Sequence, residues 1–80
     1  MSMDFMGKYV ERLRFQLGVS ARNASNLIRE AGRFADPASF LDNCVIQSEK
    51  SGLRGDEAYE RILEVIDFAA HYSRVNNELS

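Results

Sequence analysis

The stretch that decides the fold is LGVSARNASNLI, which runs from Leu17 to Ile28. Apolar residues at helical spacing stop at Leu17, Gly18 follows where a helix commonly ends, and Ser20 stands where the next helix needs an N-cap. Apolar residues return at helical spacing from Ala24 onward. The stretch therefore predicts a tight corner between two helices.

Helical spacing of apolar residues recurs in four blocks, and no strand pattern stands out. Asp36-Pro37 is typical of a helix start, because Asp caps exposed amides and Pro suits the first helical position. Gly52 and Gly55 separate the last two blocks, and Asp56 is expected to cap the last one. The predicted fold is all-α, a compact four-helix single domain over residues 1–80, with helices at about 4–17, 20–34, 37–51 and 56–75 and a frayed tail at 76–80.

The first three blocks each present one apolar face, and these faces supply the predicted core. In chain order they are Met6, Val10, Leu13 and Leu17, widened by Phe5 and Tyr9; then Ala24, Leu27, Ile28 and Ala31, with Phe34 as an extension; then Phe40, Leu41, Cys44 and Val45. After the third block, Leu53 is expected to pack back onto the helix. Cys44 is most simply a small core residue.

The fourth block is more apolar than a single buried face requires. One stripe comprises Tyr59, Leu63, Ile66 and Ala70, and a second comprises Val65, Phe68, Tyr72 and Val75, with Ile62 and Ala69 adding apolar surface. We expect burial of the second stripe within the fold, because a small bundle needs one well-covered helix. The alternative is an interface with a partner protein or with a second copy in a homodimer. Its residues would be Tyr59, Val65, Phe68, Tyr72 and Val75.

Composition and charge exclude several classes of protein. Apolar residues make up 45% of the chain and charged residues 28%, so it should fold. The net charge of −2 argues against a general nucleic-acid coat or an anionic-membrane binder. Residues 1–34 carry a net +3 and residues 35–80 a net −5, which indicates solvated faces or a charged partner. With one cysteine, no apolar run near the roughly 20 residues of a membrane span and no signal segment, a reduced, cytoplasmic setting is expected.

The residues that could carry catalysis or bind a metal are few. Cys44 with His71 and Asp67 is the only conceivable nucleophile and base, and each has an ordinary structural explanation. Glu64, Asp67 and His71 share a helix face, but a dedicated metal site usually draws ligands from more than one element. We therefore expect a non-enzymatic protein with no catalytic, cofactor-binding or metal site and no small-molecule substrate.

The corner also resembles the helix-turn-helix superfamily of bacterial and phage repressors over about 20 of 80 residues, from Val10 to Arg29. The matching residues are Leu13, Leu17, Gly18, Val19, Ala24 and Leu27. Arg14 departs from the pattern, because the family carries a small residue four positions before the glycine. The resemblance implies a DNA-binding dimer. Its DNA contacts would fall on Ser20, Ala21, Arg22, Ser25, Asn26 and Arg29, with Lys8, Arg12 and Arg33 on the phosphate backbone.

The sequence thus leaves two functions open. The leading hypothesis is a small regulatory or adaptor protein that acts through protein–protein contacts, because the fourth block has surplus apolar surface and catalytic groups are lacking. The alternative is a helix-turn-helix transcriptional regulator that binds DNA as a dimer.

Overall fold

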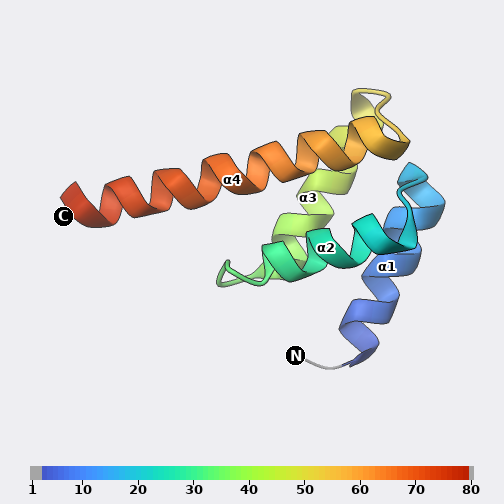
Figure 1. The fold of residues 1–80 in the computed structure, drawn as a ribbon, viewed down its shortest axis with the longest axis horizontal. Coiled ribbons are helices and arrows are strands. Elements are labelled where there is room, and N and C mark those ends of the chain that lie inside the picture. The colour runs from blue at the N-terminus through green and yellow to red at the C-terminus, as the bar shows by residue number, and fades with distance from the viewer. Residues whose placement is uncertain (1–2, 80) are drawn as a thin grey trace.

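The computed structural model describes the backbone of residues 3–79 and the side chains of residues 7–72. Its four helices are α1 (Met3–Leu17), α2 (Ala21–Ala31), α3 (Pro37–Lys50) and α4 (Gly55–Leu79). The all-α single domain is confirmed, and residues 3–79 contain no strand. Figure 1 shows α2 and α3 beside the first half of α4 and α1 packed on α2 and α3, while the second half of α4 extends beyond them. A helix of 25 residues is about 37 Å long, so the three shorter helices leave its end uncovered.

The predicted corner between α1 and α2 is confirmed. Gly18 adopts a φ of +69°, which a residue with a Cβ rarely adopts, and its amide donates to the Arg14 carbonyl. The side-chain oxygen of Ser20 then accepts from the Asn23 amide, so Ser20 is the N-cap of α2. Val19 lies between these two residues and is buried. Local backbone chemistry therefore turns the chain and starts the next helix within three residues.

The start and the end of α3 also follow the predicted signals. Asp36 accepts from the Ser39 amide as the N-cap, and Pro37 is the first helical residue. At the other end Gly52 has a φ of +72°, and its amide and that of Leu53 donate back to Glu49 and Ser48 in a Schellman arrangement. Leu53 packs against the core, as expected.

Six of the eight predicted helix ends differ from the structure, four of them by a single residue. α2 stops at Ala31 rather than at residue 34, because Gly32 caps it, and Phe34 instead stacks on Phe40 with ring centroids 4.4 Å apart. α4 begins at Gly55, so Asp56 lies inside the first turn and is not the cap. There its carboxylate still complements the positive end of the helix dipole. α4 also continues to Leu79.

The core forms where the four helices meet. Most predicted core residues are buried: Tyr9, Leu13, Leu17, Ala24, Leu27, Ile28, Ala31, Leu41, Cys44 and Val45. Val10, Phe34 and Phe40 are partly buried, and the predicted core side chains of Phe5 and Met6 lie outside the described residues.

The prediction for α4 needs correction, because its buried face is centred on Ala58, Ile62 and Ile66, with Tyr59 and Leu63 only partly buried. The expected burial of the second stripe is wrong. Val65, Phe68 and Tyr72 are exposed, because the bundle covers only one face of this helix.

Polar contacts link the helices outside the core. The Tyr9 hydroxyl of α1 donates to Asp42 of α3 at 2.8 Å, and Arg12 forms an ion pair with the same carboxylate. Burial and the Asp42 carboxylate raise the pKa of Tyr9. At the opposite end of α1, the Arg54 guanidinium donates to the Gln16 carbonyl at 3.4 Å. This contact ties the α1–α2 corner to the start of α4.

Candidate functional site

The most prominent surface feature is an apolar stripe on α4, formed by Val65, Phe68 and Tyr72 and called here the α4 stripe. These side chains are 40%, 71% and 60% exposed, although all three are large and apolar. They are spaced three and four residues apart, which places them on one helix face. The rings of Phe68 and Tyr72 stack with centroids 6.3 Å apart. Three large apolar groups on successive turns form a contiguous surface, which single exposed residues do not.

The α4 stripe adjoins a small groove between α3 and α4. The groove holds about 160 Å³ and is lined by Asn43, Cys44, Gln47, Ser48, Ser51, Leu53, Arg61, Ile62 and Val65. Val65 belongs to both the groove and the stripe, so the two apolar surfaces are continuous. A groove of this size suits one apolar side chain of a docking partner.

Carboxylates flank the apolar surface on the outer side of α4. A second depression, lined by Leu53, Glu57, Glu60, Arg61 and Glu64, shares Leu53 and Arg61 with the groove. Three carboxylates face one guanidinium there, so the depression carries net negative charge. The excess acidity of residues 35–80 is thus partly concentrated beside the α4 stripe.

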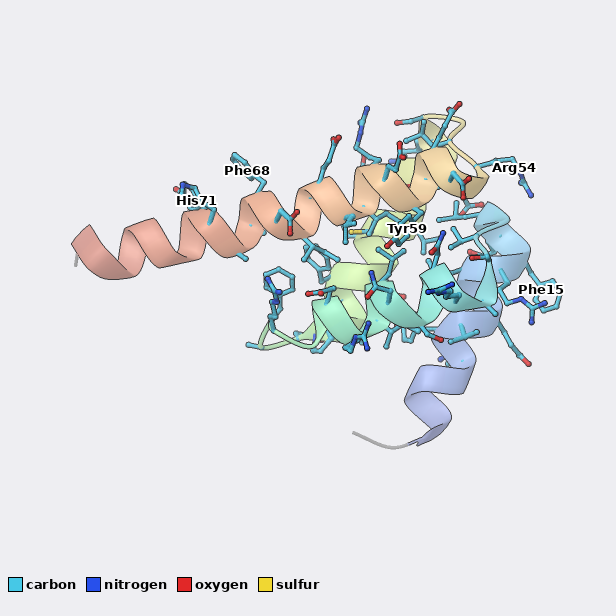
Figure 2. The ribbon with its side chains drawn as sticks, viewed as in Figure 1. Phe15, Arg54, Tyr59, Phe68 and His71 are labelled. Carbon is cyan, nitrogen blue, oxygen red and sulfur yellow. The ribbon has the colours of Figure 1, made fainter. Side chains whose placement is uncertain are left out.

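Two residues predicted for the interface do not join the α4 stripe. Tyr59 is partly buried, and its hydroxyl accepts a 2.8 Å hydrogen bond from the Asn26 amide of α2. Figure 2 shows Tyr59 between α4 and α2, whereas Phe68 points away from the bundle. The side chain of Val75 lies outside the described residues. Of the five predicted interface residues, the structure therefore brings together Val65, Phe68 and Tyr72.

The predicted DNA contacts lie on or at the start of α2, but they are not equally free. Arg22 and Arg29 are exposed, and Ser25 is partly buried. The hydroxyl of Ser20 is engaged as the helix cap. Asn26 is engaged at both ends of its amide: it donates to Tyr59 and accepts from Arg29 Nη2 at 2.7 Å. This predicted DNA contact is therefore committed to intramolecular hydrogen bonds.

The other basic residues considered for the helix-turn-helix resemblance lie on the surface or form ion pairs. Arg14 is exposed, and its guanidinium lies 5.9 Å from the centre of the Phe15 ring, so it does not separate α1 from α2. Arg12 and Arg33 form ion pairs with Asp42 and Glu30, respectively. Lys8 is exposed on α1.

Beside α2 the structure forms an open depression of about 450 Å³. It is lined by Arg22, Asn23, Asn26, Arg29 and Tyr59. Asn23 and Tyr59 are not among the predicted DNA contacts. The two arginines are seven positions apart, which is close to two helical turns, so both fall on the same side of α2. Only the packing of α4 against α2 shows that Tyr59 completes the lining.

Exposed Phe15 is a further feature that sequence reasoning missed. It is 75% exposed near the end of α1, and Figure 2 places it on the side of the molecule opposite Phe68. Its exposure could have been predicted from its position: Phe15 lies two residues from both Leu13 and Leu17, which are buried, and this spacing places it on the opposite face of the helix.

The conceivable catalytic pair is not assembled. Cys44 is buried, and this burial raises the pKa of its thiol to about 11. His71 is exposed on the side of α4 that faces away from α3, as Figure 2 shows. Within the part of the chain that the structure describes, no three His, Cys, Asp or Glu side chains are grouped to hold a metal ion. Over the same residues, no helix has the length and apolarity needed to cross a bilayer.

Compared with known proteins, the chain matches no family model, no curated protein and no solved structure at a significant level. What these surfaces do must therefore follow from their own geometry and charge.

Proposed function

We propose that this chain is a small non-enzymatic adaptor that acts through protein–protein contacts, with the α4 stripe as its docking surface. The supporting observation is the 40%, 71% and 60% exposure of Val65, Phe68 and Tyr72 on the part of α4 that the bundle leaves uncovered. Exposed apolar surface of this kind is costly in water unless a partner covers it.

The partner has a definite chemistry. Glu57, Glu60 and Glu64 lie beside the apolar surface, so a complementary segment carries Lys or Arg next to its own apolar side chains. An amphipathic basic helix meets both requirements, because its apolar face covers the stripe while its basic edge reaches the carboxylates. One apolar anchor of that helix fits the groove between α3 and α4.

A different protein suits this surface better than a second copy does. A second copy brings the same carboxylates beside the same stripe, and like charges across an interface oppose association. The charge of the docking surface thus favours a heterologous partner over the homodimer.

The direct test uses an 18-residue Leu/Lys amphipathic helix as the probe, and a Leu/Glu helix of the same pattern as the charge control. Binding is measured by fluorescence anisotropy at two salt concentrations. We expect the basic peptide to bind and the acidic one not to bind, with weaker binding at high salt. Phe68→Asp should abolish binding, and Glu64→Gln should weaken it.

The matched control is Phe15→Asp, which alters an equally exposed aromatic ring away from the α4 stripe. It should leave binding intact, and all variants should keep the wild-type circular dichroism spectrum. Equal loss in Phe15→Asp and Phe68→Asp would contradict docking at the stripe. A dimer in sedimentation analysis that Phe68→Asp dissociates would assign the stripe to a second copy instead.

DNA binding through α2 is the second candidate, and its specific support is the exposure of Arg22 and Arg29 on one side of the helix. The engagement of Asn26 by Tyr59 weighs against base reading at that position. If the chain binds DNA, its affinity for duplex DNA should fall steeply as the salt concentration rises. The affinity should also be lost in the Arg22→Ala and Arg29→Ala variants. A pure adaptor loses neither its fold nor its peptide binding in those variants.

A further inference from the structure

The depression between α2 and α4 is rich in hydrogen-bond donors and has no carboxylate in its lining. Arg22 and Arg29 supply two positive charges, and neither forms an ion pair among the described side chains. The side-chain amide of Asn23 adds donors that make no hydrogen bond within the described protein. A concave surface with two positive charges and no carboxylate in its lining attracts an anion.

Three of the side chains that line the depression are linked by hydrogen bonds. Arg29 donates to Asn26 Oδ1 at 2.7 Å, and Asn26 Nδ2 donates to the Tyr59 oxygen at 2.8 Å. Because Tyr59 accepts in this contact, its own hydroxyl proton remains available to a ligand. Arg29 likewise retains guanidinium N–H groups beyond the one that Asn26 accepts. These two hydrogen bonds therefore hold donors from α2 and α4 around one depression in the absence of a ligand.

We propose that this depression binds the phosphate group of a small ligand, such as a phosphomonoester. A phosphomonoester carries about −1.5 to −2 charge and three strong acceptor oxygens at neutral pH, which matches two arginines with amide and hydroxyl donors. A monocarboxylate would leave one arginine uncompensated. The site is independent of the α4 stripe, because it lies on the α2 side of α4 and shares no residue with the stripe.

The shape of the site favours a small ligand over duplex DNA. A reading helix must project as a ridge into the major groove. Here α4 packs against α2, and Tyr59 of α4 lines a hollow together with Asn26 of α2. Small ligands occupy concave sites of this kind, in which a few polar groups converge.

The test is a titration with inorganic phosphate at constant ionic strength, followed by NMR of the arginine Nε–Hε groups and the asparagine side-chain amides. We expect saturable shifts at Arg22, Arg29 and Asn26. Arg22→Gln or Arg29→Gln should weaken binding by about tenfold or more, because each removes a charge-assisted donor. Tyr59→Phe should weaken it by a few-fold and keep the helical circular dichroism spectrum.

Arg61→Gln is the matched control, because it removes an exposed arginine that lines the acidic depression instead. It should leave phosphate affinity unchanged. Non-saturable shifts, or an equal effect of Arg61→Gln and Arg29→Gln, would show general ion screening and overturn the site. A second arm titrates a mixed-sequence duplex. Duplex binding that is lost in Arg22→Gln and Arg29→Gln, with no saturable response to free phosphate, would assign these arginines to nucleic acid and overturn the small-ligand proposal.

Discussion

The side-chain amide of Asn26 donates a 2.8 Å hydrogen bond to the hydroxyl oxygen of Tyr59, which lies 33 residues away in the sequence. This contact joins α2 to α4. It engages one residue of the predicted DNA-binding surface on α2 and one residue of the predicted protein interface on α4. It removes Asn26 from the exposed ridge of α2 and removes Tyr59 from the exposed stripe of α4. The same contact creates the donor-rich depression between the two helices.

The Asn26–Tyr59 hydrogen bond should contribute measurably to stability. Tyr59→Phe and Asn26→Ala should each lower the free energy of unfolding by about 1 kcal/mol, because both groups are partly buried. In the double variant the losses should not add, and the coupling energy should be about 0.5–1 kcal/mol. Urea unfolding of the four proteins measures this cycle. Additive losses would mean that the two side chains do not interact in solution.

Gly18 and Gly7 should respond in opposite ways to replacement by alanine. Gly18→Ala places a Cβ on a residue with φ +69°, 3.4 Å from the Arg54 guanidinium, and should cost about 1–2 kcal/mol. Gly7→Ala places a Cβ in open space within α1 and should stabilise the protein by about 0.5–1 kcal/mol. Thermal unfolding followed at the helical circular dichroism band gives both values. A neutral Gly18→Ala would argue against the left-handed turn.

The α4 stripe and the core face of α4 should differ sharply in their effect on stability. Ile66→Ala should lower the free energy of unfolding by about 2–4 kcal/mol, because Ile66 is fully buried and the change leaves a cavity. Phe68→Ser removes a larger side chain but should change stability by less than about 0.5 kcal/mol, because that side chain already faces water. Denaturant unfolding distinguishes the two variants. A large loss in Phe68→Ser would mean that the stripe is covered within the monomer.

Cys44 should be slow to react in the native protein and should contribute to alkaline instability. Burial raises the pKa of its thiol from 9.0 to about 11, so little thiolate is present at pH 8. Between pH 9 and pH 11 the unfolded chain releases this proton more readily than the native protein does, so this group lowers stability as the pH rises.

Two measurements check the Cys44 prediction. The rate of alkylation by iodoacetamide should rise strongly when urea unfolds the chain. The Cys44→Ala variant should show a smaller loss of stability across the same alkaline range. Rapid alkylation of the folded protein at pH 8 would contradict the buried position.

Local features of the fold were predictable because each depends on a few consecutive residues. The Ser20 and Asp36 caps and the turn at Gly18 are such features, since side-chain oxygens meet amides three positions away and glycine permits a positive φ. The buried faces of the first three helices also follow from helical periodicity. Two local predictions were wrong: Gly32 ends α2 although its apolar spacing continues to Phe34, and α4 begins at Gly55, so Asp56 is not its cap.

The candidate site was less predictable, because periodicity identifies apolar stripes but not the helices that cover them. α4 has two such stripes, and the expected burial of the second was wrong because α2 and α3 pack against only one face of this helix. The acidic border beside the α4 stripe could have been inferred from the spacing of Glu57, Glu60 and Glu64. The groove beside Val65 could not, since α3 and the segment that follows it supply six of its nine lining residues.

The sequence by itself determined four helices, the caps of α2 and α3, the corner at Gly18 and the buried faces of the first three helices. These features depend on backbone dihedral angles, short-range hydrogen bonds and the 3.6-residue period. Only the tertiary structure decided that Val65, Phe68 and Tyr72 face water and that Asn26 meets Tyr59. Both outcomes depend on how distant helices pack, and packing is set by the shape of the whole core rather than by any one segment.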